Sequence, residues 1–189
     1  MENPNHILNA AVSAALIVFT PGLGRAADPQ TPSPSPAPSA WHHTGDGVMT
    51  KEFAFLTVDV FAVGHDMRCL PEHKSRLEVI EADCDKRFTW LALRAVDKDT
   101  IHESLRKAYR GVDYNSKPKI DRAISVFTAD LKEGSRVTIS YDAATKSTTF
   151  RQAGGGKAAI EGVDFMKATW SVLLGPGSHE LGDELIRRL

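Results

Sequence analysis

The sequence has little net charge, and its N-terminal apolar run is too short to cross a membrane. Its 23 basic and 24 acidic side chains leave a formal net charge of −1 over 189 residues. A protein that binds nucleic acid through electrostatics carries a basic excess, so we expect no nucleic-acid partner. The apolar segment Ile7–Phe19 is shorter than the roughly 20 residues that a membrane-spanning helix needs.

Cysteine is also scarce, and Cys69 and Cys84 are too far apart to form a Cys-x-x-Cys redox motif. In an oxidising compartment an even pair favours one disulfide, which stabilises the fold by about 3 kcal/mol in the chain-entropy model. Two unrelated free thiols are the alternative, because sequence spacing alone does not supply the geometry of a disulfide.

The N-terminal segment is typical of an export signal. Ile7–Phe19 has the length of a signal-peptide core, and small residues follow it up to Ala26 and Ala27. The first six residues lack lysine and arginine, so an uncleaved N-terminal anchor is the alternative. We expect a signal peptide over 1–27, a periplasmic or secreted protein, and no stable membrane span after cleavage.

A proline- and serine-rich segment follows the expected signal. Alternating proline and serine in Pro29–Ala40 favours an extended, solvated chain that cannot build a core. We therefore expect a linker over 28–44. The remaining residues, 45–189, are enough for one folded domain with a substantial core.

Two motifs that would indicate a cofactor or a metal are incomplete. His102 and Glu103 begin like a zinc-protease motif, but Arg106 stands where the second histidine belongs. Gly154–Gly156 lacks the lysine and hydroxyl residue of a phosphate-binding loop and is typical of a hairpin turn. We expect neither a metal nor another cofactor.

The hydrophobic pattern predicts an α+β fold in which an antiparallel sheet carries helices on one face. A long strand over Phe53–Val63 is expected to be covered on both sides, with Asp59 as a buried carboxylate that needs a partner. The other expected strands are Arg87–Val96, Val137–Tyr141, Thr148–Gln152 and Ala158–Ile160; the expected helices are Leu70–Ala82, Thr100–Arg110 capped by Asp99, one opened by Pro118, one capped by Asp164 that ends at Gly175, and one from Ser178.

Several large or charged residues within these elements have two interpretations. The simplest interpretation of Trp90, Trp170 and Phe165 is that they are core residues, although some of them can line a cleft. Arg94, inside an expected strand, is a candidate for holding a carboxylate head group. An ion pair with a nearby acid is its alternative role.

Three segments carry a family resemblance: GDGVMTKEFAFLTVDVFAV, KRFTWLALRAVDKDTI and EGVDFMKATWSVLLG. Together with the order of the elements, they resemble the chalcone isomerase-like family in its bacterial exported branch. The resemblance implies an open-faced β-sandwich, a long antiparallel sheet with a helical layer on one face and an apolar cleft between them. Plant enzymes of the family cyclise chalcones in that cleft, and related non-catalytic members are thought to hold fatty acids there.

The polar catalytic positions of those enzymes do not carry over. In the enzymes an arginine follows a Gly-x-Gly segment, whereas Met49 follows Gly45–Val48 here. The resemblance places the family's threonine at Leu56, its tyrosine and asparagine near Ile101 and Ala108, and its late hydroxyl residue at Val172. Without these groups a developing oxyanion is not stabilised, so we expect no catalytic residues and no chalcone cyclisation.

We therefore expect a non-catalytic protein that binds a fatty acid or a similar apolar small molecule in the cleft. The expected ligand-binding residues are Met49, Leu56, Arg94, Ile101, Ala108 and Val172. One alternative is an isomerase or intramolecular lyase with a rearranged site that uses Thr57, Tyr109 or Arg94. Another is an envelope protein that interacts with a partner through an exposed apolar patch.

Overall fold

The computed structural model describes residues 40–53 and 56–189. The expected signal peptide over 1–27 and most of the expected linker over 28–44 lie outside these residues. None of the helices in the described part of the chain combines the length and the hydrophobicity of a membrane-spanning segment.

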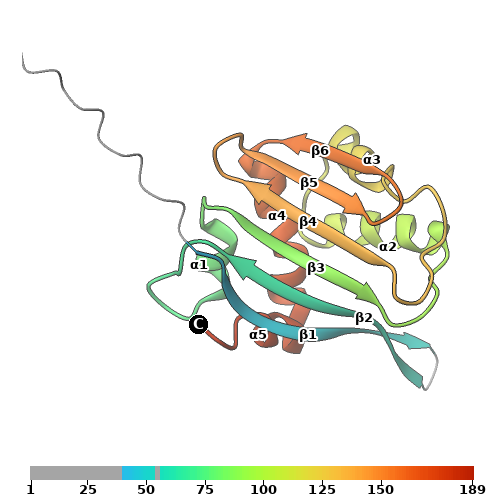
Figure 1. The fold of residues 1–189 in the computed structure, drawn as a ribbon, viewed down its shortest axis with the longest axis horizontal. Helices are drawn as coiled ribbons and strands as arrows, with labels where there is room; N and C mark the ends of the chain where they lie inside the picture. The colour runs from blue at the N-terminus through green and yellow to red at the C-terminus, as the bar shows by residue number, and fades with distance from the viewer. Residues whose placement is uncertain (1–39, 54–55) are drawn as a thin grey trace, which may run out of the picture. The chain divides into compact units, whose positions relative to one another are not determined.

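The core of the fold is a six-stranded antiparallel sheet whose strands follow one another in chain order (Figure 1). The strands are β1 (His42–Phe53), β2 (Leu56–Met67), β3 (Lys86–Ala92), β4 (Arg136–Asp142), β5 (Ser147–Gln152) and β6 (Lys157–Glu161). The predicted antiparallel α+β architecture is confirmed. Strand β1 was not predicted, and it begins at His42, before the expected domain boundary at Gly45.

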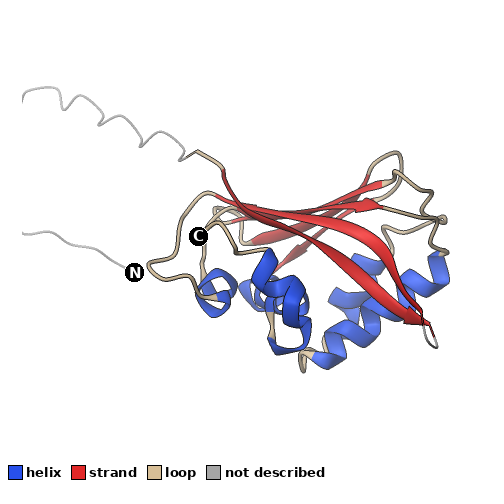
Figure 2. Cartoon of the chain, turned by 90° about the horizontal axis from the view of Figure 1, so that it is seen from below, coloured by secondary structure: helices blue, strands red, loops and turns tan. Residues whose placement is uncertain are grey.

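The helices of residues 40–53 and 56–189 all lie on one face of this sheet, as Figure 2 shows. Along β2 the side chains of Phe61, Val63, His65 and Met67 are buried, while the residues between them are partly exposed. The prediction that this strand is covered on both sides was therefore wrong. Asp59 is exposed, so it is not the buried carboxylate that the apolar run around it suggested.

The helical layer contains α1 (Arg76–Glu81), α2 (Lys98–Gly111), α3 (Lys117–Ile124), α4 (Val163–Leu174) and α5 (His179–Glu184), with a short 3₁₀ turn, η1 (Pro176–Ser178). Asp97, and not the predicted Asp99, caps α2 by accepting a hydrogen bond from the Thr100 backbone N–H at 2.8 Å. Asp164 does not cap α4, because Gly162 is its N-cap residue. The Asp164 carboxylate instead accepts a hydrogen bond from the Tyr114 hydroxyl at 2.7 Å.

Helix α4 forms the centre of the core. Phe165 and Trp170 on this helix are fully buried, and Trp90 on β3 is nearly so, as predicted. The Trp170 ring packs 5.0 Å from that of Phe88, and the Phe165 ring stacks 5.5 Å from that of Tyr109. These contacts join the sheet to α2 and α4 in one apolar layer.

The two ends of the described chain are joined at β1. The Thr44 hydroxyl donates to the Leu185 carbonyl at 2.7 Å, and the Arg188 backbone N–H donates to the Thr44 carbonyl at 2.8 Å. A Cβ atom at Gly45 would lie 2.1 Å from the Glu184 carbonyl oxygen, so only glycine permits this approach. The α5 segment is thereby fastened to the first strand.

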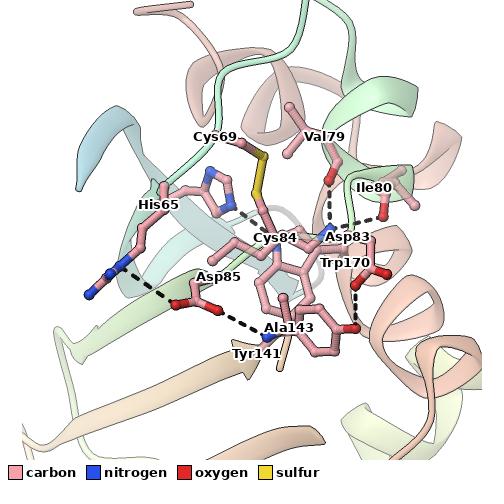
Figure 3. Close-up of a disulfide and its surroundings, with 12 residues drawn as sticks. His65, Cys69, Val79, Ile80, Asp83, Cys84, Asp85, Tyr141, Ala143 and Trp170 are labelled. Atoms are coloured by element: carbon pink, nitrogen blue, oxygen red, sulfur yellow. Dashed lines mark hydrogen bonds and ion pairs between the residues drawn. A yellow bond between two sulfur atoms is a disulfide. The ribbon is translucent and has the colours of Figure 1, made fainter. Parts of the chain in front are cut away.

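A disulfide joins Cys69 and Cys84 at the end of the sheet near α1. Figure 3 shows it beside the carbonyl groups of Val79 and Ile80 and the side chains of His65 and Trp170. The bond closes a loop of sequence separation 15 that contains α1. The predicted pairing is therefore present in the structure.

Candidate functional site

An apolar cavity of about 420 Å³ lies between strands β1 to β3 and helices α2 and α4. Buried side chains such as Phe61, Trp90, Ile101 and Leu105 form its wall. The polar lining residues are mostly exposed and form its rim: Thr50, Lys51, Arg94, Asp97, Thr100 and Ser104. Its size and its apolar wall with few polar groups are typical of a small-molecule site.

Five of the six predicted ligand-binding residues line this one cavity: Met49, Arg94, Ile101, Ala108 and Val172. They come from β1, the segment after β3, α2 and α4, so the fold brings together residues that are far apart in sequence. The sixth, Leu56, is the first residue of β2, and its side chain lies outside the described part of the structure.

A bulge in the β1–β2 pairing shapes the sheet side of the cavity. Met49 pairs with Phe61 and Thr50 pairs with Asp59, which leaves Val60 without a partner in β1. A bulge bends the strand and re-aims its side chains. As a result Met49, Val60 and Phe61 all line the cavity.

Arg94 lies at the rim, just beyond the end of β3, and not inside a strand as predicted. Its Nε donates a hydrogen bond to the Asp59 carbonyl oxygen at 2.6 Å, which holds the guanidinium beside the opening. Among the described residues Arg94 has no acidic partner, so the ion-pair alternative for Arg94 is not found there.

Of the three residues proposed for a rearranged catalytic site, Arg94 lines the cavity, whereas Thr57 and Tyr109 do not. Thr57 is exposed on β2 and does not line it. Tyr109 lies behind the wall, where its hydroxyl bonds the Thr169 hydroxyl at 2.9 Å and burial raises the Tyr109 pKa well above its ordinary value. Thr169 in turn donates to the Phe165 carbonyl at 2.8 Å, so this pair is satisfied within the core.

The histidines, cysteines and acids of residues 40–53 and 56–189 do not form a group that would hold a metal ion.

Two buried ionisable side chains near the disulfide were not predicted from the sequence. Lys86 is fully buried, and its Nζ donates to the Val79 carbonyl at 2.7 Å and the Ile80 carbonyl at 2.9 Å. The same nitrogen lies 4.9 Å from the centre of the Trp170 ring. Burial lowers the Lys86 pKa to about 7, although the charges of Asp83 and Glu81 oppose this shift.

His65 is the second buried group, and its hydrogen bonds define one neutral tautomer. The Trp170 Nε1–H donates to His65 Nε2 at 3.0 Å, so this ring nitrogen carries no proton. The other nitrogen, Nδ1, lies 2.6 Å from the Thr44 hydroxyl, whose own proton goes to the Leu185 carbonyl. Nδ1 therefore carries the proton. Burial, assisted by the charge of Lys86, lowers the His65 pKa to about 3.

Comparison with known sequences and structures gives one family match and a similar fold. A family model described as chalcone isomerase-like matches residues 55–186. The crystal structure of a fatty-acid binding protein from Arabidopsis thaliana superposes with a TM-score of 0.63 at 14% identity, covering 79% of this chain and 90% of that one. At this identity the likeness shows the fold. No curated protein matches the sequence.

Proposed function

This chain belongs to the chalcone isomerase-like family, and we propose that its apolar cavity binds a fatty acid or a similar apolar ligand without catalysing a reaction on it. The observation that carries the proposal is the wall of the cavity. Met49, Ile101, Ala108 and Val172, which the family resemblance places at or near polar positions of the family's enzymes, all line it. An acyl chain gains free energy by burial against such a wall, whereas an oxyanion does not.

Arg94 is the group best placed to hold a carboxylate at the rim. Only its Nε is used within the described residues, in the bond to the Asp59 carbonyl. A guanidinium has five N–H donors in a planar fork, so the remaining donors can bind a carboxylate in a bidentate manner. The bond to Asp59 also restricts the side chain, which lowers the entropic cost of ligand binding.

The isomerase alternative receives little support from this geometry, because of its three candidate residues only Arg94 lines the cavity, and Thr57 and Tyr109 do not. The alternative of an envelope interaction protein receives little support. The large apolar side chains that are exposed in the described structure are Trp41, Val48, Leu70 and Leu77, and they come from separate elements and loops. The similar fold of a fatty-acid binding protein supports the ligand-binding proposal.

Replacing Arg94 with glutamine is expected to weaken palmitate binding by about tenfold, since a hydrogen bond to a charged group contributes about 1.5–3 kcal/mol. Binding of hexadecanol, which has the same chain and no carboxylate, is expected to change less than about twofold by the same reasoning. Isothermal titration calorimetry with both ligands measures the two effects.

The matched control is Arg151→Gln, because Arg151 is exposed on β5 and does not line the cavity. This variant should bind both ligands as the unmodified protein does. If the Arg94 variant loses equal affinity for palmitate and for hexadecanol, Arg94 does not bind the carboxylate. Failure of the unmodified protein to bind either ligand would overturn the proposed function itself.

We also propose that the domain acts outside the cytoplasm, as a periplasmic or secreted protein. Support comes from the apolar segment Ile7–Phe19 and from the Cys69–Cys84 disulfide, which is typical of an oxidising compartment. Mass spectrometry of the protein from its native host is expected to show a mature chain that begins after Ala26 or Ala27. A full-length chain in the soluble cytoplasmic fraction would contradict this.

A further inference from the structure

A second cavity of about 670 Å³ lies on the other side of one wall of the first. It is bounded by β1, the end of α4, η1 and α5. The two cavities share four lining residues: Met49, Thr50, Ala108 and Val172. The wall between them is therefore one layer of side chains thick.

This shared wall is made of small or flexible side chains. Ala108 from α2 has only a methyl group, and Val172 from α4 is half-buried. Met49 is also half-buried and lies at the bulge of β1, where the pairing with β2 is irregular. Methionine has three rotatable side-chain bonds and adapts easily to different packing. Met49 is thus the member of this wall whose side chain can adapt most easily.

The net charges of the two cavity linings differ in sign. Lys51, Arg94 and Asp97 are the charged residues that line the first cavity, whereas Glu180 and Glu184 line the second. Glu184 is paired with Arg187 at 3.2 Å, which leaves Glu180 as the acid of the second cavity without an ion pair among the described residues. An anionic head group is therefore attracted to the Arg94 end and repelled from the other. Apolar side chains of Val48, Leu173 and Leu181 are present in the second cavity to contact a hydrocarbon tail.

We infer that the two cavities are one continuous site for a single long acyl chain. The carboxylate lies at Arg94, the chain passes Met49, and the tail ends in the second cavity. This inference rests on the proposed function, and it adds that Met49 and the second cavity determine which chain lengths bind tightly.

The test fills the second cavity without altering the first. Gly177 lines only the second cavity of the two, and a Cβ atom there would meet no atom within 4 Å. Calorimetry with octanoate, laurate, palmitate and stearate gives the dependence of affinity on chain length. In the unmodified protein each added methylene is expected to raise affinity about fourfold until the second cavity is full.

In the Gly177→Trp variant, octanoate binding should be unchanged, while palmitate and stearate should lose more than about tenfold in affinity. Leu181→Trp, which enters the second cavity from α5, should give the same pattern. The matched control is Gly111→Trp at the end of α2. A Cβ atom at Gly111 also meets no atom within 4 Å, and Gly111 lines neither cavity. It should retain the full chain-length dependence.

A Gly177→Trp variant that keeps the melting temperature and the chain-length dependence of the unmodified protein would overturn the inference. Equal loss of all four acids would overturn it as well, because the tail alone should be affected. If the unmodified protein binds none of the four acids, the proposed function fails. Binding of all four without discrimination by the variants refutes only the continuous site.

Discussion

Replacement of Lys86 with alanine is expected to destabilise the domain by about 4 kcal/mol. Two costs add in this variant. The loss of a fully buried side chain leaves a cavity beside Trp170, and the carbonyls of Val79 and Ile80 lose their donor. These carbonyls belong to the last turn of α1, where no helical N–H is available to bond them. Urea denaturation measures the change in the free energy of unfolding.

A second variant, Lys86→Met, separates these two costs. Methionine fills the space but donates no hydrogen bond, so about half of the destabilisation should be recovered. Lys157 is exposed on β6 and provides the matched control, since Lys157→Met should change the stability by less than about 0.5 kcal/mol. If Lys86→Ala and Lys157→Met behave alike, the helix-end contacts of Lys86 contribute no stability.

Acidification from pH 7 to pH 4 is expected to remove about 3 kcal/mol of unfolding free energy through His65 alone. In the folded protein the His65 pKa is lowered to about 3, while an unfolded histidine has its ordinary value of 6.5. The unfolded state therefore binds a proton more readily between these two values. The stability from neutral His65 is complete above pH 6.5 and is lost as the pH falls toward 3.

The geometry around His65 gives an independent reason for this sensitivity. Protonation adds a hydrogen to Nε2, which then faces the Trp170 N–H as a second donor in place of an acceptor. The ring is fully buried, so bulk solvent does not contact it to compensate. Denaturation curves across this pH range should show the effect as a steep decline in stability.

Glutamine at position 65 does not titrate. Between pH 7 and pH 4 the unfolding free energy of the His65→Gln variant should therefore fall by about 3 kcal/mol less than that of the unmodified protein. The substitution itself lowers stability at pH 7, and the readout is therefore the slope with pH. His42→Gln is the matched control, because His42 is exposed at the start of β1. An unchanged slope in the His65 variant would contradict the assignment.

The cavity was more predictable from sequence than the polar groups of the core. The family resemblance supplied the positions of Met49, Ile101, Ala108 and Val172, and the structure brings them to one cavity. The burial of Lys86 could not be predicted from the sequence, since a lysine at the start of a strand is ordinarily exposed. Its burial follows from tertiary packing of α1 and Trp170 around it.

Strand β1 and residue Asp59 show why local pattern failed elsewhere. The β1 segment contains two glycines and several polar residues, so it lacks the apolar alternation of a strand; pairing with β2 supplies what its own sequence does not. Asp59 lies in an apolar run, but the bulge opposite Met49 interrupts the alternation there. The alternation of apolar and polar residues in a sequence does not predict a bulge of this kind.

The attachment of α5 to β1 has a consequence for the order of events during synthesis. Because the strands follow chain order, each can pair with its predecessor as the chain is made, from β2 to β6. The Thr44 hydrogen bonds, however, require Leu185 and Arg188, which follow all six strands in the chain. The second cavity, which α5 helps to enclose, is therefore completed only after the whole sheet and α5 have been made, so a nascent chain that stops short of α5 cannot yet hold a ligand there.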